Sequence, residues 1–268
     1  LLTCSDYVTE RTRICFPRFA NRVHTLYNGT DVQRFSPSVQ EAVKNEQPPR
    51  LLFVGRLSPE KGVHTLIDAF QRVQAVIPRC QLDLVGSARL FAYAFVVACD
   101  NDGQVRKKLD RFYGLTLRSK LENQVVWRDG GYFKECTRGV CPSVLQNITY
   151  HGAMANDETA KFYQRADLFV FPPVWNEAFG IPVVEAMASG LAVVATRSGG
   201  IPEFIGDAGI LVPRSDPESL AEAIIKLLKD PETRRSMGAV GRERALTRFS
   251  WDRIAEDLES HYDRLLAV

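Results

Sequence analysis

The chain has 268 residues, of which 45% are hydrophobic, and its 34 basic and 32 acidic residues give a formal net charge of +2. This hydrophobic content can bury one large core or two modest ones, whereas the near balance of charge gives no support for a nucleic-acid partner. The longest apolar run, residues 90–99, is too short to cross a bilayer, and no basic region followed by a long apolar stretch marks a signal peptide.

The first part of the chain, residues 1–49, is expected to be a boundary region. It contains a predicted short strand at 22–27 and a polar linker that ends in Gln47, Pro48 and Pro49. From Arg50 onward, apolar runs of strand length alternate with segments of helical period. The expected strands are residues 51–54, 82–85, 124–127, 148–151, 168–171, 191–195 and 210–212, and the expected helices are 63–77, 105–117, 157–165, 181–189, 217–229, 232–247 and 251–266.

Residues 128–147 interrupt this alternation with glycines, two cysteines and a proline, and they are interpreted as an inserted loop. Elsewhere, short apolar strands separated by helices predict a mostly parallel sheet with helices on both faces, an α/β fold of Rossmann-like type. The six cysteines show no disulfide framework, so we expect reduced thiols. Cys136 and Cys141 lack a second Cys or His pair nearby, so no metal site is expected.

A candidate phosphate-binding turn follows the strand at 51–54. Gly55 and Arg56 come directly after it, and Lys61 lies five residues further along, before Gly62. Ligands of an open parallel sheet bind at the carboxyl ends of its strands, where an arginine offers a forked contact to phosphate and a lysine a movable charge. The alternative is an ordinary solvated βα turn.

A second candidate element is the pair Glu177 and Glu185, which flank a loop with Gly180 and the start of a predicted helix. A strand, a glycine loop and a helix start together offer free backbone N–H groups to an anion, while carboxylates can accept hydrogen bonds from sugar hydroxyls. The alternative has Glu177 capping the helix and Glu185 facing solvent. A third element, residues 198–203, has glycines that allow close approach of a ligand, or form a plain turn.

Three sequence strings within these elements resemble those of a known family. GRLSPEKG, EAFGIPVVEAMASGLAVVAT and GGIPE, in this order and spacing, resemble the donor-binding half of retaining glycosyltransferase family 4, a family of glycosyl transferases group 1. The earlier string VHTLYNGTDVQRF resembles the segment in which such enzymes cross between their two domains. The resemblance extends from about residue 5 to residue 268.

The resemblance implies the C-terminal half of a GT-B fold, in which two Rossmann-like domains face a cleft. Residues 1–47 would be the end of the N-terminal acceptor domain and the linker, 48–248 the donor domain, and 249–268 a helix that packs back on the N-terminal domain. Most of the acceptor domain is missing from this sequence, which leaves open a non-catalytic nucleotide-sugar-binding module. Two segments, 87–104 and 128–148, are longer than the family pattern.

The resemblance also implies roles for individual residues. The catalytic residues would be Arg56 and Lys61, which stabilise the leaving diphosphate, and Glu177, which contacts the donor sugar. The donor-binding residues would be Gly55, Gly152, Met154, Phe179, Gly180, Ile181 and Glu185, of which Glu185 holds the ribose and Gly152 and Met154 line the base pocket. His151, in the same segment, is expected to be structural.

The implied activity is transfer of a hexose from a UDP- or GDP-sugar with retained configuration, without a cofactor or a catalytic metal. The expected partners are the nucleotide sugar, a carbohydrate or lipid-linked acceptor and the missing N-terminal domain. The expected location is cytoplasmic, with peripheral contact at the cytosolic face of a membrane as an alternative.

Overall fold

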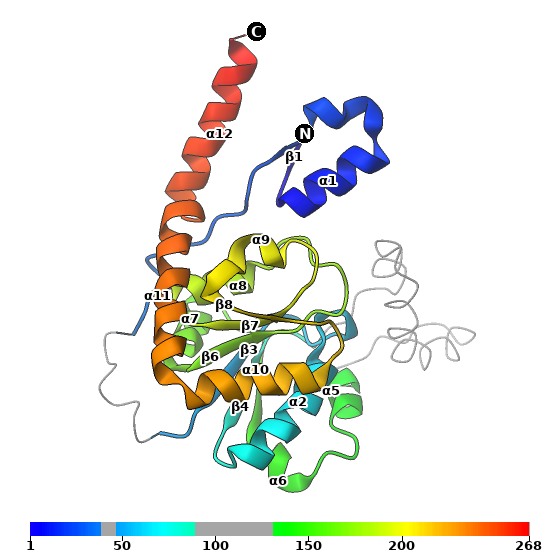
Figure 1. The fold of residues 1–268 in the computed structure, drawn as a ribbon, viewed down its shortest axis with the longest axis vertical. Coiled ribbons are helices and arrows are strands. Elements are labelled where there is room, and N and C mark those ends of the chain that lie inside the picture. Colours follow the sequence, from blue (N-terminus) through cyan, green and yellow to red (C-terminus); the bar gives the residue numbers. More distant parts are fainter. Residues whose placement is uncertain (39–46, 89–130, 268) are drawn as a thin grey trace, which may run out of the picture.

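The computed structural model of the chain describes residues 1–38, 47–88 and 131–267 (Figure 1). Its centre is a parallel sheet with the strand order β5-β4-β3-β6-β7-β8. These strands are β3 (Arg50–Val54), β4 (Gln81–Val85), β5 (Ile148–Gly152), β6 (Leu168–Phe171), β7 (Val193–Thr196) and β8 (Gly209–Val212). Because every pairing is parallel, the carboxyl ends of all these strands lie at one edge.

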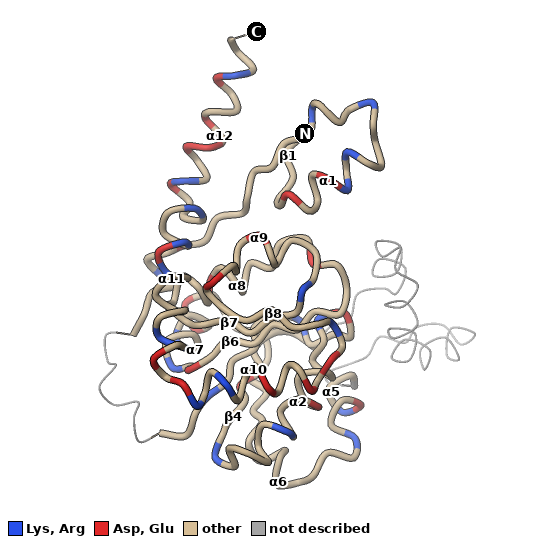
Figure 2. The backbone as a smooth tube through the Cα atoms, in the orientation of Figure 1, with Lys and Arg blue, Asp and Glu red and all other residues tan. Residues whose placement is uncertain are grey.

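Helices cover both faces of the sheet (Figure 1). α2 (Val63–Val76) packs on α10 (Pro217–Lys229) on one face, and α8 (Ile181–Ala188) packs on α11 (Pro231–Arg248) on the other. β6 and β7 carry no charged side chain, as Figure 2 shows, and all of their residues are buried. The predicted α/β fold with a parallel sheet between helices is confirmed.

The interpretation of residues 128–147 as a loop is wrong for its described part. This segment contains α5 (Gly131–Cys136) and α6 (Pro142–Leu145). Tyr132 and Cys136 lie four residues apart, are buried and form an apolar face of α5, which packs beside α2. Val140, between α5 and α6, is buried as well. The predicted helix at 105–117 and the predicted strand at 124–127 lie outside the described residues.

α7 (Asn156–Arg165) follows β5, and α9 (Ile201–Ile205) and the 3₁₀ helix η5 (Gly206–Ala208) follow β7. Sequence reasoning placed α7 correctly but described the region of α9 only as a glycine turn. The strand predicted at 191–195 begins later, at Val193, because the helix before it ends in a turn with Gly190 at φ +73°.

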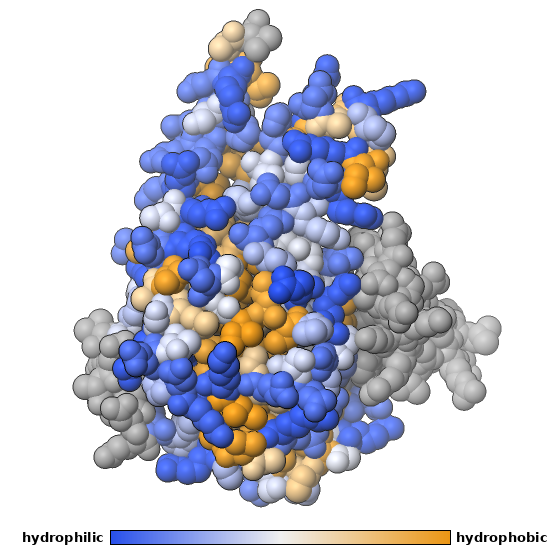
Figure 3. All heavy atoms as spheres, in the orientation of Figure 1, coloured by the Kyte–Doolittle hydropathy of each residue, from blue (hydrophilic) through white to orange (hydrophobic). Residues whose placement is uncertain are grey.

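The N-terminal segment lies apart from the main sheet (Figure 1). It consists of β1 (Leu2–Thr3), α1 (Asp6–Cys15), η1 (Pro17–Arg22) and β2 (His24–Thr25), and β1 and β2 form a small parallel pair. Ile14, Phe16 and Phe19 are 60, 59 and 54% exposed, and Figure 3 shows orange spheres at this end of the segment. The short strand predicted at 22–27 is confirmed as β2, whereas α1 was not predicted.

The last helix, α12 (Trp251–Leu266), continues from α11 and projects away from the sheet (Figure 1). Its apolar residues recur at helical spacing, at Trp251, Ile254, Leu258, Tyr262 and Leu265. Ile254 is buried, whereas Trp251, Tyr262 and Leu265 are 57, 57 and 73% exposed. α12 therefore does not serve as a cover for the core. The division of the chain at 47/48 and 248/249 stays a prediction. No helix in the described parts of the chain combines the length and apolar character needed to cross a bilayer.

Candidate functional site

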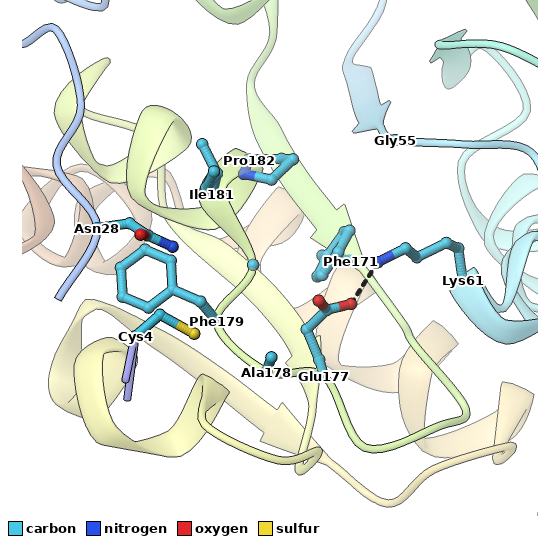
Figure 4. Close-up of a pocket in the computed structure, with 11 residues that line it drawn as sticks. Cys4, Asn28, Gly55, Lys61, Phe171, Glu177, Ala178, Phe179, Ile181 and Pro182 are labelled. Carbon is cyan, nitrogen blue, oxygen red and sulfur yellow. Dashed lines mark hydrogen bonds and ion pairs between the residues drawn. The ribbon is translucent and has the colours of Figure 1, made fainter. Parts of the chain in front are cut away.

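A cavity of about 300 Å³ lies at the carboxyl ends of β3 and β6 (Figure 4). This is the edge at which open parallel sheets bind their ligands. The cavity combines residues that are far apart in the sequence. They are Cys4, Asn28, Gly55, Lys61, Phe171, Glu177, Ala178, Phe179, Gly180, Ile181 and Pro182.

The charged groups of this cavity are Lys61 and Glu177, whose Nζ and Oε2 atoms lie 2.5 Å apart. Both side chains are largely buried, at 13 and 9% exposure. Each charge is therefore stabilised by the other, because an unpaired buried charge is costly. Lys61 ends the 3₁₀ helix η3 (Pro59–Lys61), and Gly62 follows at φ +73°. A Cβ at Gly62 would lie 1.9 Å from the carbonyl oxygen of Pro172, so glycine lets the lysine turn approach the end of β6.

Glu177 is held by groups around its own loop. The indole Nε1 of Trp175 donates to Glu177 Oε2 at 3.0 Å, and the Glu177 N–H donates to Ser198 Oγ at 3.2 Å. The Gly200 N–H donates to the Glu177 carbonyl at 2.9 Å, and a Cβ at Gly199 would lie 1.9 Å from that same carbonyl oxygen. The glycine element at 198–203 therefore supports the Glu177 loop from behind.

The start of α8 provides the other polar feature of the cavity. Gly180 caps this helix at φ +90°, a left-handed conformation that favours glycine. Within the described residues, the N–H groups of Phe179, Gly180 and Ile181 donate no hydrogen bond. Unpaired N–H groups at a helix start attract anions. The cavity thus combines such a helix start with a lysine and a carboxylate.

Lys61 also lies among aromatic rings. Its Nζ is 5.0 Å from the Trp175 ring centroid and 5.7 Å from that of Phe171, within the range of a cation–π contact. These rings and Glu177 together hold the ammonium group at the carboxyl ends of β3 and β6.

The structure does not bring every predicted site residue to this cavity. Arg56 follows Gly55 directly but lies outside the lining, and its Nη2 pairs with Glu60 Oε1 at 3.1 Å. Glu60 is fully buried and also accepts from Ser58 Oγ at 2.6 Å. The signal for this pairing was the spacing of four residues between opposite charges.

Glu185 lies in α8, away from the cavity lining. The hydroxyl of Tyr163, a fully buried residue, donates to Glu185 Oε2 at 2.8 Å. Burial raises the pKa of Glu185, and the hydrogen bond from Tyr163 opposes that rise by stabilising the charged form. Glu185 is thus a partly buried carboxylate, and its Oε2 atom already accepts one hydrogen bond.

The base-pocket candidates lie at the end of β5. Gly152 ends this strand at φ +78°, and its carbonyl accepts from the Gly86 N–H at 2.8 Å. Met154 packs against the core. His151 Nε2 lies 2.8 Å from Asp83 Oδ1, and Arg50 Nη1 lies 2.7 Å from the other carboxylate oxygen of Asp83, an arrangement that suits the structural role expected of this histidine.

Known proteins resemble the chain along most of its length. The pattern of the family described as "Glycosyl transferases group 1" matches residues 36–127 and 143–244, which together make up more than half of the sequence. The chain belongs to this family. The unmatched residues 128–142 fall within the predicted insertion, and the matched segments contain Lys61, Glu177 and the start of α8.

Individual members of the glycosyltransferase family agree with this assignment. The GDP-mannose-dependent monoacylated alpha-(1-6)-phosphatidylinositol monomannoside mannosyltransferase of Corynebacterium glutamicum is 29% identical over 95% of this chain and 59% of its own length. The structure of sucrose-phosphate synthase from Thermosynechococcus elongatus matches 99% of this chain with a TM-score of 0.67 and 28% identity. Anabaena HepE, solved with UDP and glucose, matches 98% of it with a TM-score of 0.67 and 22% identity.

The chain spans only part of these proteins, 58% of the sucrose-phosphate synthase chain and 62% of HepE. The fold of the described residues is that of GT-B glycosyltransferases. Among the described residues, no group of three or more His, Cys, Asp or Glu side chains is placed to hold a metal ion.

Sequence reasoning missed several residues that line the cavity. Cys4 and Asn28 line it from the N-terminal segment, which precedes the family match and was interpreted as a boundary region. Trp175 touches both charged groups, and its signal was a lone aromatic residue two positions before Glu177. Phe171 ends a strand that was predicted, but its position beside Lys61 depends on the pairing of β3 with β6.

Proposed function

We propose that this chain is the donor-binding part of a retaining glycosyltransferase of family 4, which transfers a hexose from a UDP- or GDP-sugar to a carbohydrate or lipid-linked acceptor. The observation that carries the proposal is the Lys61–Glu177 pair beside the N-terminal end of α8, in a cavity at the carboxyl edge of the sheet. A nucleotide sugar needs a cationic, N–H-rich site for its diphosphate next to a hydrogen-bond acceptor for its sugar hydroxyls. This cavity offers both.

In the proposed complex, Lys61 exchanges its contact with Glu177 for the diphosphate. The N–H groups of Gly180 and Ile181 bind further phosphate oxygens, and the positive end of α8 adds to their attraction. Arg56 approaches the same phosphates by leaving Glu60. Without a metal, these groups have to offset the negative charge that develops on the departing nucleotide.

Glu177 then accepts hydrogen bonds from the hydroxyls of the transferred sugar. Glu185 accepts from the ribose hydroxyls through the carboxylate oxygen that Tyr163 leaves available, and Gly152 and Met154 border the base. Gly55 allows close approach of the ligand to the end of β3, where its own φ is +155°. Guanine and uracil both remain candidates for the base, because one relative is named for GDP-mannose and HepE was solved with UDP.

Retention of configuration follows, in this proposal, from substitution on one face of the sugar. The bond between the anomeric carbon and the phosphate oxygen breaks while the bond to the acceptor oxygen forms, and the acceptor proton passes to the leaving phosphate oxygen. Lys61 and Arg56 stabilise that oxygen. The acceptor is bound by the N-terminal half of the whole enzyme, and a non-catalytic module is disfavoured because the relatives are named as transferases. The proposed location is cytoplasmic, including the cytosolic face of a membrane.

Calorimetric titration with UDP and with GDP tests the proposal. Lys61→Ala should weaken binding of the preferred nucleotide by about 10- to 100-fold, as expected for the loss of a charge-assisted contact. Lys229→Ala is the matched control, since Lys229 is an exposed lysine at the end of α10. Equal affinity of the wild type and the Lys61 variant for both nucleotides would refute the proposal.

A further inference from the structure

The wall of the cavity that faces Lys61 is made by the N-terminal segment. Figure 4 shows Cys4 and Asn28 beside the Phe179 ring, on the opposite side of the cavity from Lys61. Asn28 is half-buried, and it lies eight residues before the family match begins at residue 36. This wall is therefore not accounted for by the motifs of the donor domain.

The backbone around Asn28 is fixed by contacts on its C-terminal side. A Cβ at Gly29 would lie 2.5 Å from the Trp251 ring, so the chain passes directly over the start of α12. The Thr30 N–H donates to the Phe249 carbonyl at 2.7 Å. Asn28 is thus held at the junction of α11 and α12.

The other half of the wall is fixed to the Glu177 loop itself. Ser5 Oγ donates to the Ala178 carbonyl at 2.6 Å. The carboxylate of Glu203 accepts from the N–H groups of Asp6 and Tyr7, at 2.8 and 2.6 Å, at the positive end of α1. These contacts keep Cys4 and Asn28 in place across the cavity from Glu177.

The side chain of Asn28 has unused capacity for hydrogen bonds. An asparagine amide has two donor hydrogens and an acceptor oxygen, and among the described residues this amide has no hydrogen-bond partner. Its neighbour Cys4 is partly buried, and burial raises the pKa of its thiol, so the thiol is neutral at pH 7. This wall consequently offers hydrogen bonds without charge.

A neutral donor–acceptor wall suits hydroxyl groups, whereas the phosphates are drawn to Lys61 and the start of α8. We propose that Asn28 binds a hydroxyl of the transferred sugar, opposite Glu177, and so takes part in selecting the donor sugar. This inference rests on the proposed function. It adds a specificity-determining residue from outside the donor domain, and it makes the N-terminal segment part of the donor site.

The test compares the affinity of Asn28→Ala for a nucleotide sugar with its affinity for the corresponding nucleoside diphosphate, using the sugar donor and the base preferred by the wild type. The loss of one hydrogen bond to a hydroxyl should weaken the binding of the nucleotide sugar about 3- to 10-fold. Binding of the diphosphate should change less than about 2-fold, because none of its contacts is removed.

Asn21→Ala is the control, since Asn21 is an exposed asparagine of the same segment outside this cavity. Asn28 does not have a positive φ, so alanine is compatible with the backbone at this position. A thermal melt of each variant checks that the fold is retained, and Asn28→Ser, which keeps a hydroxyl donor and acceptor, should recover part of the lost affinity.

Two outcomes overturn the inference. Equal losses for sugar nucleotide and diphosphate would mean that Asn28 shapes the site or binds phosphate, and unchanged affinity for both would mean that it binds nothing. In either case tight binding of the diphosphate by the wild type leaves the proposed function standing. Failure of the proposed function is instead recognised by the absence of nucleotide binding in the wild type.

Discussion

Replacing Gly199 by alanine should displace the loop that carries Glu177. Gly199 has φ +51°, and a Cβ at this position would lie 1.9 Å from the Glu177 carbonyl oxygen and 2.7 Å from its carbonyl carbon. Both atoms belong to the backbone, so no side-chain rotation relieves the collision. The loop has to move, and the Glu177 carboxylate moves with it.

The magnitude follows from two separate effects. A non-glycine residue in the left-handed region costs about 1–2 kcal/mol, and overpacking against backbone adds about 1–3 kcal/mol. Gly139 is the matched control because it has φ +77° but no described atom within 4 Å of the place where a Cβ would lie. Gly139→Ala should therefore show the first effect alone.

Thermal denaturation and titration with a nucleotide sugar measure both consequences. At about 2–4 °C per kcal/mol for a protein of this size, Gly139→Ala should lower Tm by roughly 5 °C and Gly199→Ala by roughly 10 °C. Gly139→Ala should bind the donor as the wild type does, and Gly199→Ala should lose most of its affinity. Similar melting temperatures and similar affinities for the two variants would show that the glycine element does not position Glu177.

Two further predictions concern the groups that hold the carboxylates. Trp175→Phe keeps a ring near Lys61 but removes the N–H donor to Glu177, so calorimetry should show about 3- to 10-fold weaker binding of nucleotide sugar with the diphosphate unaffected; an equal change for both ligands contradicts this. Burial raises the pKa of Glu185 above its value in the unfolded chain. The folded chain therefore loses stability as the pH rises through the pKa of Glu185 in the folded state. Tyr163→Phe removes the bond that opposes the shift, and urea unfolding should show about 1–2 kcal/mol greater loss at pH 8 than at pH 5, whereas equal losses at the two pH values refute it.

Most of the sheet was predictable because its strands are short, continuous apolar runs between helices. The predicted segments at 51–54 and 168–171 match β3 and β6 almost residue for residue, since strands buried on both faces carry no polar position. α5 was not predicted although Tyr132 and Cys136 lie four residues apart. The glycines and the proline around these positions are typical of a loop, and a single apolar pair does not outweigh them.

The cavity was only partly predictable, for reasons of distance along the chain. Lys61 and Glu177 are 116 positions apart, and no local pattern indicates that they pair; their joint role came from the resemblance of two motifs. Asn28 belongs to a segment whose sequence resembles a crossover between domains, which says nothing about which side chain faces the cavity. Arg56 was predicted from its position after a strand, whereas its contact with Glu60 depends on how the following turn folds.

The ion pair at the centre of the cavity also determines how the proposed site distinguishes its ligands. A nucleoside diphosphate draws Lys61 toward its phosphates but brings nothing to Glu177, so a largely buried carboxylate loses its cation. A nucleotide sugar supplies hydroxyl donors to Glu177 at the same moment, and the carboxylate remains satisfied. Recognition of phosphate and of sugar is thereby coupled through one contact of 2.5 Å. On the proposed function, the intact donor is favoured over the nucleotide that remains after transfer, and this preference helps the product to leave.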